Sequence, residues 1–281
     1  MISISDISIV IVLYQELPPA YIYEDFGVNY ILVDNTPGRN LNLDIPNVYY
    51  IPLDENYGIA KALNVGFSLA KKQGFSWVLT MDQDSLLSQN MLAGYTKFIN
   101  VSHQKIGIVC PLLQVYRDEK VLQQDTYVQV NEALTSGSLI NMEAYEAAGG
   151  FLEKLFIDEV DFEFCWHIRS LGYHIYQLNN VVMQHQLGDT KEYKFFGRHV
   201  FYVMNEKPIR HYYMQRNQLY VRNQYANIYP EIKPTFWGTF MCLVKIVLFE
   251  KNVLKKLKAR YLGYRDYKSN IFGECKYKEQ L

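Results

Sequence analysis

Four short apolar runs rich in β-branched and aromatic residues occur in the first third of the chain. Each is bounded by Pro, Asn, Asp or Gly, and they are Ile7–Leu13, Tyr30–Val33, Val48–Ile51 and Trp77–Met81. Such runs are typical of buried β-strands. Between the third and fourth runs, apolar residues recur at helical spacing from Ile59 to Ala70, and Gly74 follows as the expected C-terminal cap. Strands separated by helices predict an α/β fold with a mostly parallel sheet, covered by helices on both faces.

The second half of the chain has no repeat or low-complexity segment and ends in helical material. A helical pattern begins near Ile209, and Pro230 and Pro234 mark a break near residue 230. We therefore expect two domains, residues 1–230 and a helical, basic extension over residues 231–281. The 281 residues are 49% hydrophobic and 20% charged, which excludes a disordered or fibrous chain.

Cysteine usage and the N-terminal pattern favour a cytoplasmic protein. The four cysteines are scattered without CxxC spacing, which argues against a zinc ribbon and against a secreted disulfide framework. The apolar N-terminal run lacks a basic leader and is interrupted by Asp6, so we expect a first buried strand rather than a signal peptide.

Polar residues follow each predicted strand, at the edge where α/β sheets bind ligands. They are Tyr14, Asp34-Asn35, Asn56-Tyr57-Gly58 and Asp82-Gln83-Asp84. The chain has no GxGxxG after the first strand and no GxxxxGK[ST], so neither a dinucleotide-binding site nor a P-loop is supported.

Two of these strand ends are acidic. Residues two apart on a strand share a face, so Asp82 and Asp84 could hold Mg²⁺ or Mn²⁺ with a substrate diphosphate, although a simple turn has the same composition. Asp34 could accept the imide N–H of uracil or thymine, or could form an Asx turn before Asn35-Thr36-Pro37-Gly38.

A second acidic cluster precedes a helical pattern at residues 158–163. Acids in a first helical turn are stabilised by the helix dipole, which accounts for most of them. Like-charge crowding beside apolar residues also gives a carboxylate the pKa of a general base. We favour Asp161 as the base, with Asp158 and Glu163 as alternatives. His185 stands alone after an apolar run, and such a histidine is more often packed or solvated than a ligand.

Taken in order, these segments resemble the inverting glycosyltransferases of family 2, with the GT-A fold, and most closely their bacterial rhamnosyltransferase branch. The resemblance covers about residues 7–225 and rests on VIVLY, ILVDN, NYGIAKALNVG, LTMDQDS, LTSGSLI, FIDEVDFEFCWHIRSLGY, HQLGD and YYMQRN. The chain departs from the family pattern at His167, where Arg is more usual, and has Val160 where the wider family has an acid.

The resemblance implies roles for the candidate residues. Asp34 would recognise a pyrimidine base, and Tyr14, Asn56, Gly58 and Lys61 would surround the nucleotide. Asp82 and Asp84 would hold the ribose and a Mg²⁺ or Mn²⁺ diphosphate, with His185 as a further metal or diphosphate contact, and Asp161 has the position of the base. Arg210 and Arg216 would neutralise the leaving diphosphate or contact an anionic acceptor.

The expected partners follow from this family and from the C-terminal charge. The donor would be dTDP-L-rhamnose or a UDP-sugar, and the acceptor a glycan or lipid-linked glycan of a bacterial surface polysaccharide; no nucleic-acid partner is expected. Residues 251–281 carry a net charge of +6, against −7 for the rest of the chain, and follow the apolar stretch Phe236–Phe249. That stretch either lies on the inner face of the plasma membrane or packs on the core or on a second subunit of a homodimer.

Two other functions remain open at this stage. A sugar-phosphate nucleotidyltransferase has a similar sheet, but it usually carries a Gly-rich basic loop after the first strand, and VLYQELPPA has none. A non-catalytic nucleotide-sugar-binding protein of a glycan assembly complex would use the acidic cluster only as a helix cap.

Overall fold

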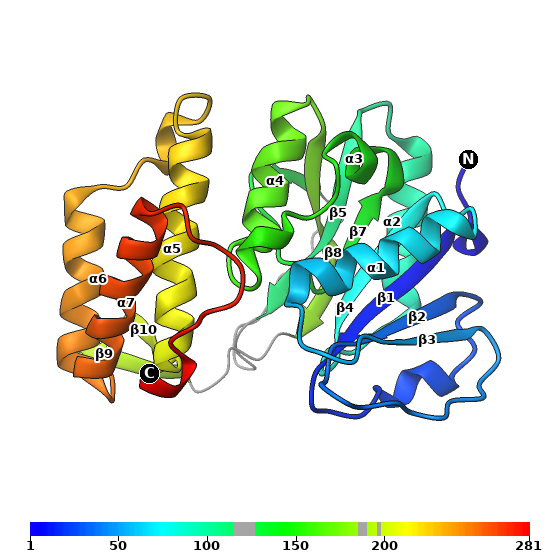
Figure 1. Ribbon diagram of the computed structural model, residues 1–281. Coiled ribbons are helices and arrows are strands. Elements are labelled where there is room, and N and C mark those ends of the chain that lie inside the picture. The colour runs from blue at the N-terminus through cyan, green and yellow to red at the C-terminus, as the bar shows by residue number, and fades with distance from the viewer. Residues whose placement is uncertain (115–126, 185–189, 196–197) are drawn as a thin grey trace. The chain divides into compact units, whose positions relative to one another are not determined.

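The computed structural model describes residues 1–114, 127–184, 190–195 and 198–281, and the chain divides into two compact units. The first unit contains residues 1–156 and 160–185. The second contains residues 157–159 and 186–281. Figure 1 shows the α/β sheet of the first unit and the helices of the second.

The first unit is built on an eight-stranded sheet with the order β3-β2-β1-β4-β7-β5-β8-β6. Its strands are β1 (Ile7–Leu13), β2 (Asn29–Asp34), β3 (Val48–Pro52), β4 (Trp77–Asp82), β5 (Ile106–Gln114), β6 (Tyr127–Val130), β7 (Ser138–Asn141) and β8 (His174–Gln184). β1 pairs in parallel with β2 and β4, β2 with β3, and β5 with β8, whereas β7 runs antiparallel between β4 and β5. β6 is an antiparallel edge strand on β8. The predicted mostly parallel α/β sheet is therefore confirmed.

Helices cover both faces of this sheet, as the alternation of side chains along its strands requires. The helical elements are η1 (Ile4–Asp6), η2 (Ala20–Tyr23), α1 (Ile59–Lys72), α2 (Gln89–Val101), α3 (Met142–Ala147), η3 (Glu153–Leu155) and α4 (Val160–Ser170). On one face, Gly66 of α1 lies against Val10 and Val33. On the other face, Ile9 and Ile11 belong to the same apolar core as Met91 and Tyr95 of α2. The central strands are consequently mainly apolar and almost fully buried.

The second unit is mainly helical. It contains the hairpin of β9 (Thr190–Phe195) and β10 (Arg198–Met204), then α5 (Pro208–Tyr225), η4 (Pro230–Ile232), α6 (Phe236–Phe249), α7 (Val253–Lys268) and η5 (Lys278–Gln280). α5 and α7 pack closely at Gly263, where a Cβ would lie 2.4 Å from the carbonyl oxygen of Tyr212. The Tyr212 hydroxyl donates to the buried Asp266 carboxylate at 2.8 Å across the same contact.

A buried charged cluster ties the end of α6 to α5 and α7. The Lys256 ammonium group, 1% exposed, donates to Glu250 at 2.6 Å and to Asn205 at 2.7 Å. His211 Nε2 lies 3.1 Å from the same Glu250 carboxylate. Burial lowers the pKa of His211, although Glu250 opposes that shift. Glu250 and Lys256 therefore neutralise each other inside the unit, which is the condition for burying either charge.

The compact units divide the chain at a different place from the predicted domains. The sequence analysis placed the boundary near Pro230, whereas the second unit begins at residue 186 and includes α5. The physical reason is the contact between α5 and α7, which joins the helix before the proline break to the helix after it. The helices predicted near Ile209 and over Phe236–Phe249 are confirmed.

Gly66 offers a test of how closely α1 packs on the sheet. A Cβ at this position would lie 2.5 Å from Val10 Cγ1, and 3.3 Å from Val33 Cγ2. Valine has little rotamer freedom to yield. We expect Gly66→Ala to lower the free energy of unfolding by about 1–3 kcal/mol, although alanine alone favours a helix by about 1 kcal/mol. Urea unfolding would measure this change.

Ser68→Ala, at an exposed position of the same helix, is the matched control. It should change the unfolding free energy by less than about 0.5 kcal/mol. A stabilised Gly66→Ala protein would contradict the close contact of α1 with β1.

Candidate active site

The parallel register brings the ends of four strands to one edge of the sheet. Leu13 pairs with Asp34 across β1 and β2, and Val12 pairs with Asp82 across β1 and β4. On the other side of β2, Asp34 pairs with Pro52 at the end of β3. Residues separated by tens of positions in the sequence, Tyr14, Asp34 and Asp82 among them, therefore meet at this edge.

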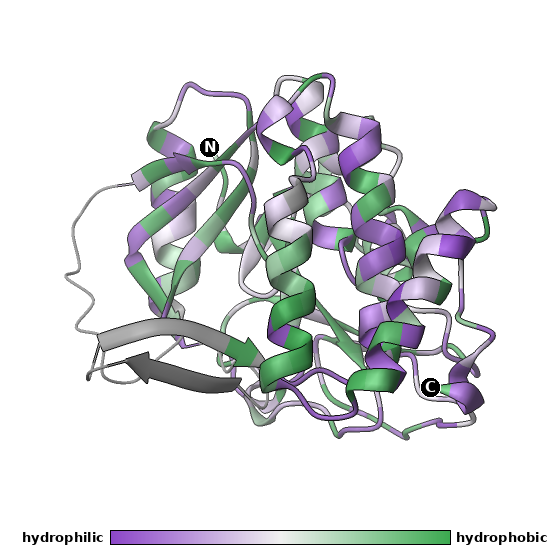
Figure 2. Cartoon of the chain, turned by 90° about the vertical axis from the view of Figure 1, so that its left-hand side faces the viewer, coloured by the Kyte–Doolittle hydropathy of each residue, from purple (hydrophilic) through white to green (hydrophobic). Residues whose placement is uncertain are grey.

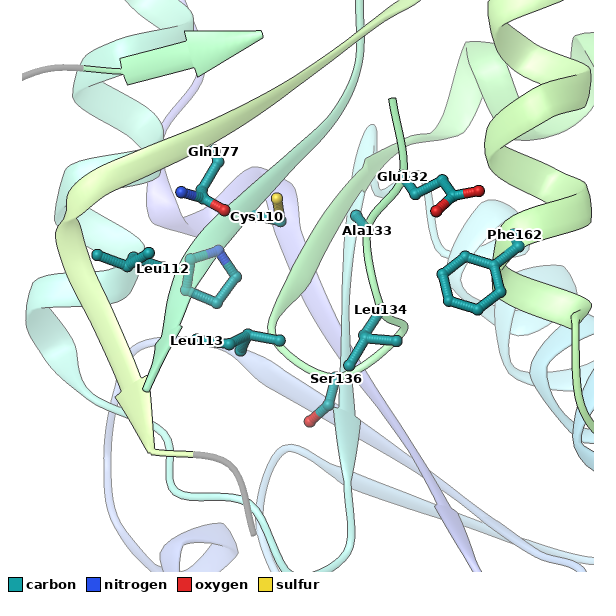
Figure 3. A pocket seen from close by; sticks show the side chains of 10 residues that line it. Cys110, Leu112, Leu113, Glu132, Ala133, Leu134, Ser136, Phe162 and Gln177 are labelled. Carbon is teal, nitrogen blue, oxygen red and sulfur yellow. The ribbon is translucent and has the colours of Figure 1, made fainter. Parts of the chain in front are cut away.

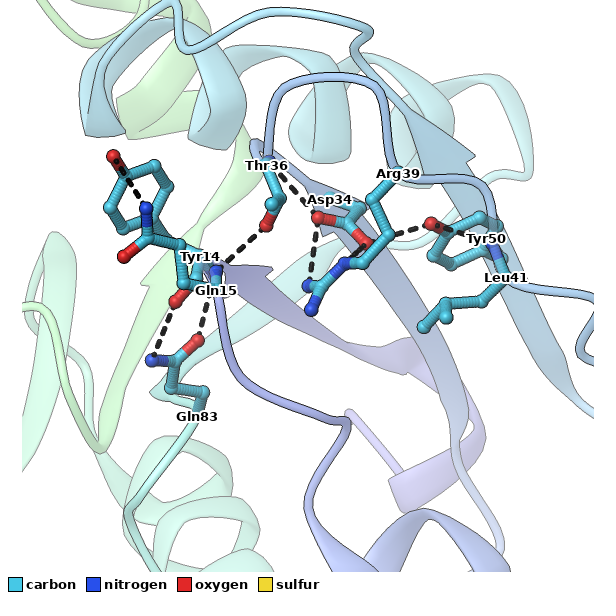
Figure 4. A network of polar contacts seen from close by, with 8 residues as sticks. All are labelled: Tyr14, Gln15, Asp34, Thr36, Arg39, Leu41, Tyr50 and Gln83. Carbon is cyan, nitrogen blue, oxygen red and sulfur yellow. Dashed lines mark hydrogen bonds and ion pairs between the residues drawn. The ribbon is translucent and has the colours of Figure 1, made fainter.

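Asp34 is completely buried and accepts four hydrogen bonds, shown in Figure 4. Its Oδ2 accepts from Arg39 Nε at 2.6 Å and from the Tyr50 hydroxyl at 2.7 Å. Its Oδ1 accepts from Arg39 Nη2 at 2.9 Å and from the backbone N–H of Thr36 at 3.0 Å. Burial alone would raise the pKa of Asp34, but the bonds from Arg39, Tyr50 and Thr36 outweigh it and the pKa lies below its usual value.

These bonds use all the acceptor positions that a carboxylate offers, about four. The candidate base contact therefore cannot simply be added to these four bonds, one of which is the Asx-turn bond from Thr36. A pyrimidine imide N–H would have to replace an existing donor. Arg39, whose side chain is 19% exposed, is the donor with access to solvent.

A second network fixes the loop that leads into α1. Asn35 donates to Asn56 Oδ1 at 3.0 Å and accepts from the backbone N–H of Tyr57 at 2.8 Å. Asn56 Oδ1 also accepts from the N–H of Gly58. Gly58 has φ +82°, and a Cβ there would lie 2.4 Å from the carbonyl oxygen of Phe156, so only glycine fits. The loop is thus set by backbone geometry at the end of β2.

Lys61 lies on the first turn of α1, and its side chain is half-exposed. Its ammonium group lies 3.2 Å from Glu153, and both side chains are 45% exposed. An ion pair this exposed contributes little to stability. Lys61 can therefore exchange Glu153 for another anion, and its contact with a nucleotide stays a prediction.

The middle residue of Asp82-Gln83-Asp84 ties this motif to β1. Gln83 Oε1 accepts from the backbone N–H of Tyr14 at 2.8 Å, and its Nε2 donates to the Tyr14 carbonyl at 3.3 Å (Figure 4). The N–H of Asp82 donates to the Ser136 hydroxyl at 3.2 Å, which in turn lies 2.7 Å from the Ser85 hydroxyl. The main chain of the motif is therefore held from two sides.

The two acids of this motif can contribute oxygen ligands to a cation. Asp82 is partly buried at the strand end and Asp84 is exposed. Among the described residues, no group of three or more His, Cys, Asp or Glu is gathered as a metal site. Two carboxylates fit Mg²⁺ or Mn²⁺ when phosphate oxygens and water complete the coordination, as is usual for Mg²⁺. His185, the third predicted ligand, lies outside the described residues.

A cavity of about 340 Å³ lies beside this motif in the first unit (Figure 3). Leu112 and Leu113 of β5, Leu134, Ser136 and Phe162 are among its lining residues. Ser136 bonds the backbone of Asp82, and Phe162 follows Asp161 on α4. The cavity therefore extends from the Asp82 side of the edge to the start of α4, and its lining is mainly apolar.

The favoured base, Asp161, lies in the first turn of α4 and is partly exposed. Its Oδ1 accepts from the backbone N–H of Phe162 at 3.0 Å. Glu163 is 4% exposed and points into the protein interior, which makes it the least accessible of the three candidate acids. Asp161 thus combines a helix N-terminus with access to solvent.

Asp158 belongs to the second unit and has a different environment. Arg210 donates to its Oδ1 at 2.6 Å, and its Oδ2 is buried without a hydrogen-bond partner among the described residues. Burial raises the pKa of Asp158 to about 6 against the opposing effect of Arg210. Phe156, Asp158 and Glu159 all have positive φ values, 69°, 65° and 65°. Non-glycine residues adopt this conformation at a cost, and such strain is found at functional segments.

The two predicted phosphate-binding arginines have other partners here. Arg210 is bonded to Asp158, so its contact with a diphosphate stays a prediction. Arg216 is fully buried, with its guanidinium between Tyr212, Tyr213 and Phe272 and a bond to the Gly273 carbonyl oxygen at 2.8 Å. The prediction that Arg216 contacts phosphate or acceptor needs correction, because its charge is enclosed in the second unit.

Sequence reasoning did not identify Arg39, Tyr50, Gln83 or Ser136 as site residues. Ser136 lies in the quoted LTSGSLI segment and Gln83 between the two acids, so the motifs did contain a signal for both. Arg39 and Tyr50 meet Asp34 only because β2 and β3 pair in parallel. No local pattern marks them.

Comparison with known proteins finds similarity to glycosyltransferases. Residues 31–140 match the model of glycosyl transferase family 2. A curated relative, the dTDP-rhamnosyl transferase RfbF of Shigella flexneri, is 26% identical over 266 residues, which are 88% of each chain. The match to the family model includes Asp34, Asp82 and Ser136.

Solved structures add the fold. The structure of GalNAc-T7 with UDP, GalNAc and Mn²⁺ is 14% identical, with a TM-score of 0.52, over 94% of this chain and 56% of that one. The present chain thus spans little more than half the length of that protein. The structure of residues 1–349 of S. aureus TarS is 13% identical, with a TM-score of 0.46, over 94% of this chain and 91% of that one. Within the first unit, residues 31–140 thus match glycosyl transferase family 2, and the α/β fold of the chain is similar to that of GalNAc-T7.

Proposed function

We propose that the protein is a metal-dependent, inverting glycosyltransferase that moves L-rhamnose from dTDP-L-rhamnose to a hydroxyl group of a glycan or lipid-linked glycan. The observation that carries this proposal is the cavity of about 340 Å³ between the Asp82 side of the sheet edge and the start of α4. A glycosyl group in this cavity would lie near Ser136, whose hydroxyl accepts from the N–H of Asp82, and near Phe162, which follows Asp161 on α4.

The apolar lining supports a deoxysugar donor. Leu112, Leu113, Leu134 and Phe162 present hydrocarbon to the cavity. Rhamnose carries a methyl group where common hexoses carry a hydroxymethyl group, and burying a hydroxyl without a hydrogen-bond partner costs about 1–3 kcal/mol. The curated relative named as a dTDP-rhamnosyl transferase supports the same donor.

In the reaction, the acceptor oxygen attacks the anomeric carbon on the face opposite the nucleotide. Asp161 takes the hydroxyl proton as the new C–O bond forms. The bond between the anomeric carbon and the phosphate oxygen breaks, and its electron pair leaves with dTDP. Because attack and departure lie in line, the configuration of the anomeric carbon inverts.

The remaining residues bind and orient the donor. Asp34 would accept the thymine imide N–H in exchange for a bond from Arg39, and Gln83 and Ser136 would hold the backbone of Asp82-Gln83-Asp84 in place. A Mg²⁺ or Mn²⁺ ion on Asp82 and Asp84 would neutralise the negative charge of the diphosphate. The Mn²⁺ in the named structure of GalNAc-T7 supports a divalent cation here.

Replacing Asp161 and Asp158 one at a time shows which of them is the general base. We expect Asp161→Asn to lower kcat by about 10²–10⁴-fold, the usual contribution of a general base, with little change in the donor KM. Asp158→Asn should retain more turnover, since Asp158 is bonded to Arg210. Release of dTDP from dTDP-rhamnose and acceptor would measure both.

The pH dependence of kcat/KM is an independent check on which carboxylate is the base. A base must be deprotonated, so activity rises with pH through the pKa of the base. If the acid limb of kcat/KM falls near pH 6 and disappears in Asp158→Asn, the carboxyl whose pKa is raised to about 6 is the base, and the assignment to Asp161 is wrong.

The acids of Asp82-Gln83-Asp84 make the metal dependence testable. We expect Asp84→Asn to weaken Mn²⁺ binding at least about tenfold in the presence of dTDP, because it removes one of two carboxylate ligands. Titration calorimetry would measure this affinity. Asp54→Asn, which removes an exposed carboxylate after β3, is the matched control and should bind Mn²⁺ as the wild type does. If both variants weaken Mn²⁺ binding equally, the loss comes from the change in net charge and Asp84 is not a ligand.

Thermal stabilisation by nucleotides tests the base contact of Asp34. A site that accepts an imide N–H should bind dTDP and UDP more tightly than GDP by at least about fivefold, since an unmatched buried polar group costs about 1–3 kcal/mol. The wild-type protein is measured with each nucleotide, with and without Mn²⁺. A preference for GDP would contradict the role of Asp34.

A further inference from the structure

The most apolar helix of the protein lies largely exposed. α6 presents six large apolar side chains to solvent, with exposed fractions of 37–68%, namely Trp237, Phe240, Met241, Leu243, Val247 and Leu248. On the opposite side, Ile246 is 1% exposed and α6 contacts α7. Figure 2 shows α6 as a predominantly hydrophobic helix. Contiguous exposed apolar surface of this kind marks an interaction site.

The length of α6 bears on what covers this surface. By length and composition, Pro230–Phe249 is the one segment of the described residues able to cross a membrane, and only 6% of its most apolar window is buried. The α-helix itself has 14 residues, Phe236–Phe249. At about 1.5 Å per residue it measures about 21 Å, shorter than the hydrocarbon core of about 30 Å. Its start is fixed by Thr235, whose side chain accepts from the N–H of Gly238 at 3.0 Å.

Both ends of α6 are attached to the second unit. At its C-terminal end, Glu250 bonds Lys256 inside the buried charged cluster. Before its N-terminal end, η4 contacts α5. A helix tied at both ends to a folded unit is suited to lying along a surface rather than to crossing one.

The charges around α6 indicate the nature of that surface. Lys251, Lys255 and Lys258 follow the helix with exposed side chains, and Lys233 precedes it. Glu250 is turned inward and neutralised by Lys256, which leaves Glu231 as the exposed acid of residues 230–258. An apolar helix face flanked by exposed lysines is complementary to an anionic lipid surface, which takes up both the hydrocarbon and the positive charge.

We propose that α6 docks the protein on an anionic lipid surface by lying in the membrane interface, with Trp237, Phe240, Val247 and Leu248 among the acyl chains and the flanking lysines on the headgroups. This inference does not depend on the proposed sugar donor. It would bring a transferase with a lipid-linked acceptor to the surface that holds this acceptor.

Vesicle flotation of the full chain tests this proposal. We expect the wild type to float with equimolar phosphatidylcholine and phosphatidylglycerol and to remain unbound with phosphatidylcholine alone. Trp237→Gln combined with Leu248→Gln should weaken binding to the anionic vesicles at least about tenfold, because two apolar side chains no longer enter the lipid. Val101→Gln, at a residue 69% exposed on α2, matches Leu248, which is 66% exposed, and should bind as the wild type does.

The charge contribution is tested separately. Lys251→Gln and Lys255→Gln should each weaken binding to anionic vesicles about fivefold, corresponding to about 1 kcal/mol per lysine near the surface. Binding that is unaffected by the apolar double variant would overturn the proposal. Resistance of the bound protein to extraction by alkaline carbonate would also overturn it, in favour of a spanning helix.

Sedimentation velocity tests the alternative, in which the exposed face of α6 is covered by a second copy of the chain. If the wild type is a dimer, the apolar double variant is a monomer and neither binds vesicles, α6 is a subunit interface and the lipid proposal is wrong. Turnover of a water-soluble acceptor should be the same in the double variant and the wild type. Loss of that turnover would instead indicate damage to the fold. Circular dichroism would detect such damage, and the lysine variants would then test docking in a folded protein.

Discussion

The parallel hydrogen-bond ladders that join β1 to β2 and to β4 decide where the chemistry of this protein lies. They set Leu13 beside Asp34 and Val12 beside Asp82, so the ends of these strands meet at one edge. A shift of one residue in either ladder would turn the side chains of a strand to the opposite face. The buried apolar faces under α1 and α2 forbid that shift, and the core therefore holds the acids of the edge in position.

The sequence was sufficient for the elements on which this edge depends. The four strands and α1 show continuous or periodic apolar patterns, and their observed bounds differ from the predicted ones by at most two residues. The partners of Asp34 could not be predicted, because Arg39 and Tyr50 reach it through pairing of β2 with β3. The prediction that Arg216 contacts phosphate or acceptor failed for a related reason. An isolated arginine in a helix gives no sign that Tyr212, Tyr213 and Phe272 will enclose it.

The acidic segment before α4 shows how folding separates residues that look equivalent in sequence. Asp158 is buried, bonded to Arg210 and set in a left-handed backbone, whereas Asp161 is partly exposed at a helix N-terminus. Burial raises the pKa of Asp158 and so favours its protonated form, whereas Asp161 keeps access to solvent. Four acids in six residues therefore have distinct properties, and the difference comes from burial and backbone rather than from composition.

The attachment of α6 at its ends has an evolutionary consequence. Among the residues between Thr235 and Glu250 whose side chains the structure describes, Ile246 is the one apolar residue that is fully buried, so packing restricts few of these positions. Exchanges among leucine, valine, methionine and phenylalanine would leave the character of this stretch intact. By this argument, hydrophobicity constrains α6 more than the identity of its residues does, in contrast to Gly58 and Gly66, where close contacts leave no room for a side chain.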